Sequence, residues 1–123
     1  MKVHFLDDDF ATNRFHELTL ETVAQELNME LSFYIDPEEL LETYAQSNDI
    51  PNLLFCDVNM PRMNCWEFID NYMVLFPRAM TDIIILTTSE DPTVSQRAED
   101  YSLIKDVTTK LLRPQYLQNL DKS

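Results

Sequence analysis

The chain has 123 residues, 45% of them hydrophobic, which suffices for one well-buried core without disulfides or metals, so we expect a single domain over residues 1–123. A net charge of −13, from 9 basic and 22 acidic residues, repels nucleic acid and anionic membranes and argues against direct binding to either. The N-terminus lacks a signal-peptide pattern, no run of about 18 apolar residues occurs, and the two cysteines lack metal-binding spacing, so we expect a cytoplasmic protein with both cysteines in its core.

The first part of the chain predicts a strand and then a long helix. Lys2–Leu6 is a short β-type run that ends in three consecutive carboxylates, Asp7, Asp8 and Asp9. Apolar residues at helical spacing predict an amphipathic helix over Phe10–Leu27, with an inward face formed by Ala11, Phe15, Leu18, Leu20, Val23 and Leu27. Asp9 is the natural N-cap of this helix, which leaves Asp7 and Asp8 without a structural explanation.

Two further strand–helix pairs follow. Met29–Ile35 is predicted to be a strand, and Asp36 with the proline after it starts a second helix. The apolar run Leu53–Cys56 then continues directly into Asp57, as in a strand buried on both faces, which places Asp57 at the carboxyl end of that strand. After a turn, Asn64 caps a third helix, whose inward residues are predicted to be Trp66, Ile69, Met73 and Phe76.

The last part of the chain repeats the alternation. Ile83–Leu86 is the most strongly β-branched run and is therefore predicted to be the central strand, with Thr87 at its end. A fourth helix begins after Asp91, and a weaker strand over Asp106–Thr109 leads to Lys110. A short helix that opens with a proline is predicted last.

This alternation predicts an α/β fold, a doubly wound five-stranded parallel sheet with helices on both faces. If the first and third strands are neighbours, Asp7, Asp8 and Asp57 converge in one cleft at the carboxyl edge of the sheet. Carboxylates a few ångströms apart repel one another, so either the pKa of one of them is raised or the cluster binds a cation. A cluster whose ligands are all oxygen suits Mg²⁺. Such a site favours acyl-phosphate chemistry, with Asp57 as nucleophile and Lys110 and Thr87 stabilising the phosphoryl oxygens.

Together these features resemble the receiver domain of two-component response regulators, over essentially the whole chain. The motifs that carry the resemblance are Phe5-Leu6-Asp7-Asp8-Asp9, Leu53–Asp57 with Asn59-Met60-Pro61 and Asn64-Cys65-Trp66-Glu67-Phe68, Ile84-Ile85-Leu86-Thr87-Thr88, and Thr109-Lys110-Leu111-Leu112. The resemblance implies a flavodoxin-like fold. It also implies a signalling module that is no enzyme beyond catalysing its own phosphorylation and dephosphorylation.

The resemblance implies roles and partners as well. Asp57 would be the phosphoacceptor, Thr87 the switch hydroxyl and Lys110 the phosphate-contacting lysine. The implied Mg²⁺ ligands are Asp7, Asp8, Asp57 and the backbone carbonyl of Asn59. The implied donor is a sensor histidine kinase or a histidine phosphotransfer protein, and the output would be contact with a downstream protein through the fourth helix, the fifth strand and the last helix.

The chain departs from the usual receiver pattern at several positions. The family usually has proline, often after a cis peptide bond, where Leu111 stands, and an aromatic residue where Val107 stands. Arg62 and Cys65 occupy the loop in which glycine is common. The chain has no glycine at all, so we expect Asn and Asp to occupy any backbone position with positive φ.

Two alternatives stay open. A degenerate receiver, working as an interaction module without phosphorylation, is favoured by the departures at Leu111 and Val107 and by the absence of the usual loop glycines. A small aspartate-nucleophile phosphohydrolase normally has a second aspartate two residues after the nucleophile, where this chain has Asn59. The two histidines, His4 in a predicted strand and His16 on a predicted helix, are assigned no function.

Overall fold

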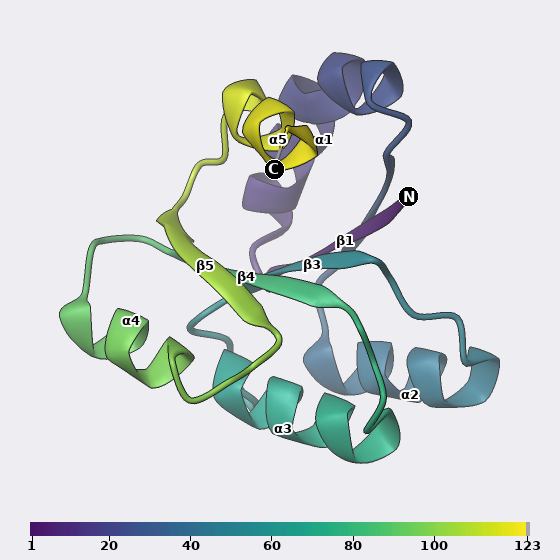
Figure 1. The fold of residues 1–123 in the computed structure, drawn as a ribbon, viewed down its shortest axis with the longest axis vertical. Coiled ribbons are helices and arrows are strands. Elements are labelled where there is room, and N and C mark those ends of the chain that lie inside the picture. The colour runs from purple at the N-terminus through teal and green to yellow at the C-terminus, as the bar shows by residue number, and fades with distance from the viewer. Residues whose placement is uncertain (123) are drawn as a thin grey trace.

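The computed structural model describes residues 1–122, in which five strands alternate with five helices (Figure 1). In chain order they are β1 Lys2–Leu6, α1 Phe10–Glu26, β2 Glu30–Tyr34, α2 Pro37–Ser47, β3 Leu53–Asp57, α3 Cys65–Leu75, β4 Asp82–Thr87, α4 Pro92–Ala98, β5 Ile104–Thr109 and α5 Pro114–Asp121. The predicted α/β class and every predicted element are confirmed, although β5 begins at Ile104, before the predicted start at Asp106.

The strands form one parallel sheet in the order β2-β1-β3-β4-β5. The chain winds outward from β1 in one direction and from β3 in the other, so the topological switch point lies between β1 and β3. The prediction that Ile83–Leu86 forms the central strand is wrong, because β3 occupies the centre and β4 lies beside it. Both strands are interior and buried on both faces, so β-branched content does not tell one from the other.

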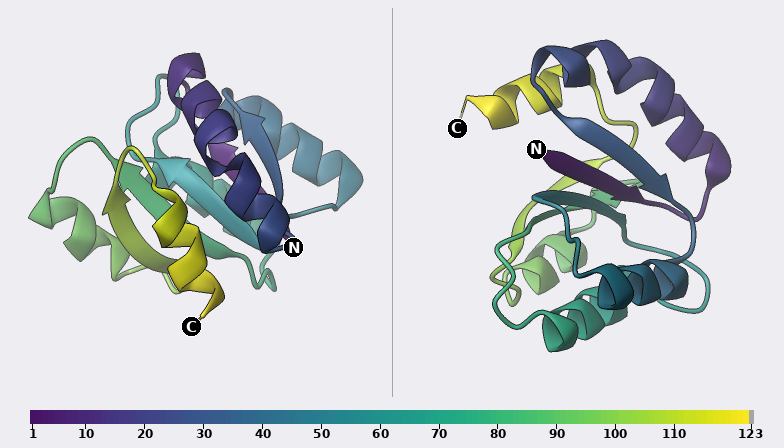
Figure 2. Two further views of the ribbon diagram at one scale, coloured as in Figure 1. Left: turned by 90° about the horizontal axis from the view of Figure 1, so that it is seen from above. Right: turned by 90° about the vertical axis from the view of Figure 1, so that its right-hand side faces the viewer.

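Helices cover both faces of the sheet. Figures 1 and 2 show α1 and α5 on one face and α2, α3 and α4 on the other. Each face has its own apolar core. The cluster under α1 and α5 is built around Val3, Phe5, Leu20, Phe55, Ile84 and Leu117, and the opposite cluster around Leu6, Leu40, Leu54, Phe68, Ile69 and Ile85. Among the described residues, no helix has the length and apolar content needed to span a membrane.

The N-terminal half of α1 is turned differently from the prediction. Phe15 and Leu18, predicted to face inward, are 42% and 59% exposed, and Ala11 is also exposed. The buried residues of α1 are Thr12, Asn13, His16, Leu20, Val23 and Ala24. Apolar spacing therefore identified the inward face only for the second half of the helix. The first half lies beside polar strand ends, so polar side chains face inward there.

The inward face of α3 is wider than predicted. Its buried residues are Cys65, Trp66, Phe68, Ile69 and Tyr72, whereas Met73 and Phe76 are only partly buried. Most of this helix is apolar or aromatic, so periodicity alone does not separate its faces. Both cysteines are buried free thiols, as predicted.

Within residues 1–122, three residues adopt a positive φ. Asn28 and Asn48, each with φ of 55°, follow α1 and α2 and confirm the prediction that asparagine takes over from glycine. Arg62, with φ of 71°, contradicts it, because a residue with a long side chain occupies the left-handed region there. Arg62 lies in the loop between β3 and α3, so the backbone is strained close to the end of the central strand.

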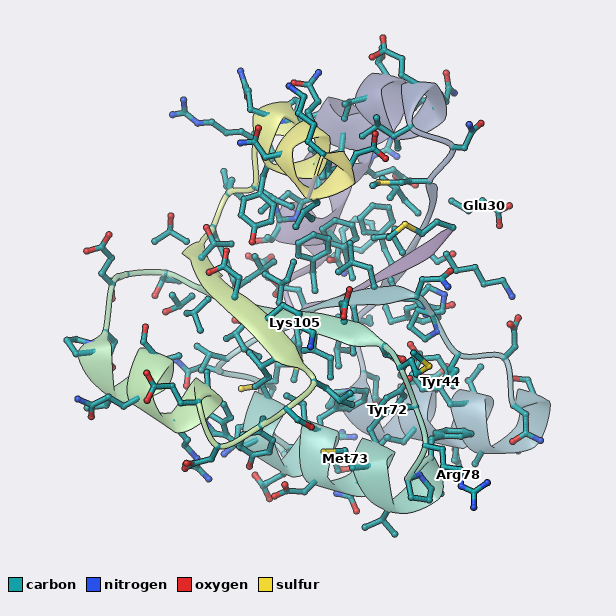
Figure 3. The ribbon with its side chains drawn as sticks, in the orientation of Figure 1. Glu30, Tyr44, Tyr72, Met73, Arg78 and Lys105 are labelled. Atoms are coloured by element: carbon teal, nitrogen blue, oxygen red, sulfur yellow. The ribbon has the colours of Figure 1, made fainter. Side chains whose placement is uncertain are left out.

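Two buried hydrogen bonds link α2 and α3 to β1 and to the residue before β4. Tyr44 and Tyr72 lie edge to face, 5.6 Å between ring centroids, between the sheet and its helices α2 and α3 (Figure 3). The Tyr72 hydroxyl is 2.6 Å from Thr81 Oγ1, and the Tyr44 hydroxyl is 2.7 Å from His4 Nδ1. His4 is therefore a satisfied core residue, consistent with assigning it no function.

Candidate functional site

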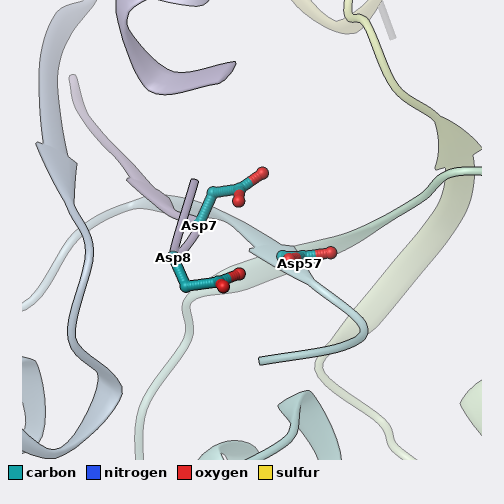
Figure 4. A group of neighbouring side chains, drawn as sticks. All are labelled: Asp7, Asp8 and Asp57. Carbon is teal, nitrogen blue, oxygen red and sulfur yellow. The ribbon is translucent and has the colours of Figure 1, made fainter. Parts of the chain in front are cut away.

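The register of β1 and β3 brings three carboxylates together. Leu6 of β1 lies opposite Cys56 of β3, so the next residues along the two chains, Asp7 and Asp57, meet at the carboxyl edge of the sheet. Figure 4 shows Asp7 and Asp8 at the end of β1 and Asp57 at the end of β3. One carboxylate oxygen from each residue lies within 4.8 Å of the others. Asp7 and Asp57 are buried, 2% and 4% exposed, whereas Asp8 is open to solvent.

Lys110 reaches the same place from β5. Its backbone N–H donates to the Thr87 carbonyl at 2.8 Å, which continues the pairing of β4 and β5 past the last strand residue. Its ammonium nitrogen lies 2.9 Å from Asp7 Oδ2 and 3.0 Å from Asp57 Oδ1. One cation therefore bridges the two buried carboxylates, and Asp8 adds a third negative charge at the solvent side.

These contacts shift the protonation of the site. Burial, and then the negative charge of Asp7, raise the pKa of Asp57 from its ordinary 3.8 to about 6, although Lys110 opposes the shift. Burial alone lowers the pKa of Lys110, but its bonds to Asp7 and Asp57 outweigh burial and raise that pKa overall. At neutral pH the Asp57 carboxylate is therefore mostly ionised, more basic than an exposed aspartate, and faces a fixed positive charge.

Asp9, the third aspartate of the acidic run, is the N-cap of α1 and not part of the carboxylate cluster. The Asp9 carboxylate accepts hydrogen bonds from the Ala11 N–H at 3.0 Å and from the Thr12 hydroxyl at 2.9 Å, as an N-cap does. The backbone N–H of Asp9 donates to Asp7 Oδ1 at 2.9 Å. The prediction that Asp9 caps the helix is confirmed, and its backbone helps to orient Asp7.

Thr87 stands at the predicted place, but its hydroxyl is engaged. It ends β4 next to Asp57 and is 5% exposed. Its hydroxyl donates to the carbonyl of Ser89 at 2.9 Å, inside the loop that leads to α4. The hydroxyl thus lies at the edge of the site, bonded to the loop and not to an aspartate.

The loop after Asp57 is pinned at both ends. Val58 donates its N–H to the Leu86 carbonyl at 3.0 Å. At the far end Asn64 and Glu67 form a capping box, in which each side chain accepts the other's backbone N–H, at 3.0 and 3.2 Å. Asn59 lies exposed within this loop, so the metal-ligand role predicted for its carbonyl stays a prediction.

Two polar residues of α1, to which the sequence assigned no role, contact the backbone of the segments that carry the site residues. Asn13 donates from Nδ2 to the carbonyls of Asp7 and Tyr34, both at 3.1 Å, and so ties the ends of β1 and β2 together. His16 accepts the N–H of Leu112 at Nε2, at 2.9 Å, just beyond a Lys110–Leu111 peptide bond that is cis. A sequence signal for both exists, because positions 9, 12, 13 and 16 share a helix face and are all polar.

The donor set fits a hard divalent cation. Three carboxylate oxygens within 4.8 Å of one another form a group that could hold a metal ion, and all three ligands are oxygen. Asp8 is exposed, so water can complete a coordination shell on that side. Mg²⁺ keeps several waters and binds through one or two carboxylates, which matches this partly open arrangement.

Comparison with known proteins identifies the fold. No protein-family model matches the chain, and no curated protein matches it. Among solved structures, it is similar to a two-component response regulator from Cytophaga hutchinsonii, with a TM-score of 0.85, 22% identity and coverage of 98% of this chain and 93% of the other. It is also similar to the Vibrio cholerae chemotaxis protein CheY4, with a TM-score of 0.78, 23% identity and coverage of 98% and 96%.

A third similar structure is also a response regulator receiver domain. The receiver domain of AraT, a response regulator from Geobacillus stearothermophilus, has a TM-score of 0.75 and 26% identity, with coverage of 98% of this chain and 89% of the other. The chain therefore has the fold of response regulator receiver domains over nearly its whole length, and the resemblance predicted from the sequence is confirmed at the level of structure.

Proposed function

We propose that this chain is a phosphoacceptor module that takes a phosphoryl group onto Asp57 from the phosphohistidine of a sensor histidine kinase or a histidine phosphotransfer protein. The observation that carries the proposal is the position of Asp57. It ends the central strand, with the Lys110 ammonium 3.0 Å from one carboxylate oxygen and two further aspartates beside it. Nucleophile, cation and metal-binding oxygens thus share one edge of the sheet.

The chemistry follows from what each side chain does. A carboxylate oxygen of Asp57 attacks phosphorus, the P–N bond of the donor breaks, and the electron pair stays on the donor's imidazole. Lys110 supplies a fixed positive charge to the phosphoryl oxygens, and its contact with Asp7 holds it in place. Thr87 donates to a phosphoryl oxygen once its hydroxyl leaves the Ser89 carbonyl.

Asp7, Asp8 and Asp57, with the backbone carbonyl of Asn59, would hold Mg²⁺. The ion would offset negative charge on the phosphoryl oxygens. The open side at Asp8 supports this role, because both the ion and the donor have to enter from solvent. We further propose that the output is protein contact, through the face of α4, β5 and α5 that carries Val94, Tyr101, Val107 and Tyr116.

Two alternatives remain to be separated by experiment. A degenerate receiver would explain Leu111 and Val107, yet the buried Asp7–Lys110–Asp57 arrangement has no need to be kept in a module that is never phosphorylated. A phosphohydrolase needs a second acid two residues after the nucleophile, and Asn59 at that position offers no carboxylate. The arrangement of Asp57 and Lys110 therefore supports phosphoacceptance best.

Labelling of the intact protein tests this proposal. Acetyl phosphate or phosphoramidate with Mg²⁺ should add one phosphoryl group, seen by mass spectrometry, and Asp57→Asn should abolish the addition. Asp100→Asn, a change at an exposed carboxylate in the connection between α4 and β5, is the matched control and should label like wild type. Equal labelling of Asp57→Asn and wild type would remove Asp57 as the acceptor. Absence of labelling in wild type would favour the degenerate receiver.

A further inference from the structure

We infer that His16 of α1 is a positioning residue, which holds the segment after Lys110 and thereby keeps the Lys110 ammonium between Asp7 and Asp57. His16 is buried and is not one of the acids, the hydroxyl or the lysine of the candidate site. The effect of His16 on the rate of phosphorylation rests on the proposed function. The effect of His16 on the position of Lys110 does not depend on phosphorylation.

His16 joins two distant parts of the chain. Its side chain is fully buried, and its Nε2 accepts the backbone N–H of Leu112 at 2.9 Å, across 96 positions in sequence. The ring contacts those of Phe5 and Phe15, with centroids 5.3 and 6.2 Å away. An acceptor at Nε2 requires a neutral ring with its proton on Nδ1, and burial favours the neutral form by lowering the pKa of His16.

The hydrogen bond matters because of where Leu112 lies. Lys110 is fixed on its N-terminal side by its own N–H, which donates to the Thr87 carbonyl at 2.8 Å. On its C-terminal side Leu111 is 47% exposed and offers little packing, and the next fixed residue is Leu112, whose side chain is buried in the core and whose backbone N–H donates to His16. The two bonds bracket Lys110, whose ammonium lies 2.9 and 3.0 Å from its two carboxylates.

A purely structural role explains His16 less well. Its place on α1, beside Phe5 and one turn before Leu20, would suit an apolar side chain, which needs no hydrogen bond when buried. A buried imidazole carries two nitrogens, and Nδ1 of His16 has no hydrogen-bond partner among the described residues. Burying an unpaired Nδ1 costs stability, and the hydrogen bond from the Leu112 N–H to Nε2 offsets that cost.

Three substitutions separate the hydrogen bond from packing. In His16→Gln, Oε1 lies as many bonds from Cβ as Nε2 does, so it can accept from Leu112. His16→Asn has the same polarity but is one bond shorter and cannot reach. His16→Leu fills the space without an acceptor. Urea unfolding of all three measures the loss of stability, and the Gln and Asn variants are matched for the cost of a buried amide.

NMR of the metal-free protein tests the structural part directly. Ring ¹⁵N shifts of wild type should show the Nδ1–H tautomer, with a scalar coupling between His16 Nε2 and the Leu112 amide. The Lys110 ammonium signal, slowed in exchange by its ion pairs, should persist in His16→Gln and be lost in His16→Asn and His16→Leu. An Nε2–H tautomer, or a Lys110 signal unchanged in all three variants, would overturn the inference.

Phosphorylation kinetics then test the consequence. With phosphoramidate and Mg²⁺, His16→Asn should be slower than His16→Gln by about tenfold or more, since a shift of about 1 Å in a catalytic group can cost ~100-fold. In a Lys110→Ala background the same two variants should differ by less than about twofold, because the effect passes through Lys110. A difference that persists without Lys110 would overturn the positioning role. If wild type itself is not phosphorylated, the proposed function fails, and the NMR result alone decides the inference.

Discussion

Replacing Asp57 by asparagine should stabilise the metal-free protein at neutral pH, because the ionised Asp57 side chain is buried beside another carboxylate. Burial and the charge of Asp7 raise the pKa of Asp57 from 3.8 to about 6. A carboxyl group whose pKa is higher in the folded than in the unfolded chain contributes stability below pH 3.8 and loses that contribution as the pH rises through about 6. Above that pH, folding of the wild-type protein buries the ionised Asp57 carboxylate beside Asp7, which lowers stability.

The size of the effect follows from the same two values. The difference between 3.8 and about 6, at about 1.4 kcal/mol for each pH unit, corresponds to a stability cost of ~3 kcal/mol above pH 6. Asparagine removes the charge but also weakens the contact with Lys110 and buries an amide, which costs about 1–2 kcal/mol. We therefore expect a net gain of about 1–2 kcal/mol, or several degrees in the melting midpoint.

Urea unfolding of wild type and Asp57→Asn, in a metal chelator at constant ionic strength, measures the gain as a function of pH. The gain should be largest above pH 6 and should fall away toward pH 3.8, where Asp57 is neutral in wild type too. Burial lowers the pKa of His4 and His16, so their contribution to stability declines as the pH falls below 6.5, equally in both proteins. Asp100→Asn controls for the general loss of one negative charge. A gain that does not change with pH, or that Asp100→Asn reproduces, would refute the reasoning.

Two further predictions concern the same edge of the sheet. Mg²⁺ at ten times its Kd should stabilise wild type by about 1.4 kcal/mol and Asp8→Asn much less, measured as melting midpoints with Ca²⁺ and monovalent salt as controls; equal gains would mean that the acids are not a metal site. Arg62→Asn should raise the free energy of unfolding by up to ~1 kcal/mol, because asparagine tolerates the positive φ of 71° better than arginine does. A loss of stability in urea unfolding of this variant would count against strain at that position.

The architecture was predictable because each element follows a short-range rule. Strand-length apolar runs, caps at Asp9, Asp36 and Asn64, and prolines at helix starts all lie within a few residues of the feature that they specify. The convergence of Asp7 and Asp57 required one assumption, that β1 and β3 are neighbours, and the strand order satisfies it. Parallel topology then places their carboxylates together without any further signal in the sequence.

What the sequence did not reveal depends on contacts between distant parts of the chain. The inward face of α1 was misassigned because apolar periodicity assumes an apolar neighbour, whereas its first turns lie against carbonyl groups at the ends of β1 and β2. The partner of His16 is 96 positions away, on a backbone N–H that any residue could provide. The sequence around His16 and around Leu112 gives no sign that the two residues form a hydrogen bond.

Thr87 shows how the site and the loop before α4 are linked. A threonine hydroxyl has a single hydrogen to donate, and here it goes to the Ser89 carbonyl at 2.9 Å. A phosphoryl oxygen on Asp57 can receive that hydrogen only if the Ser89 carbonyl gives it up and finds another donor or water. Any use of Thr87 by a phosphoryl group therefore changes the hydrogen bonding of the segment that leads into α4.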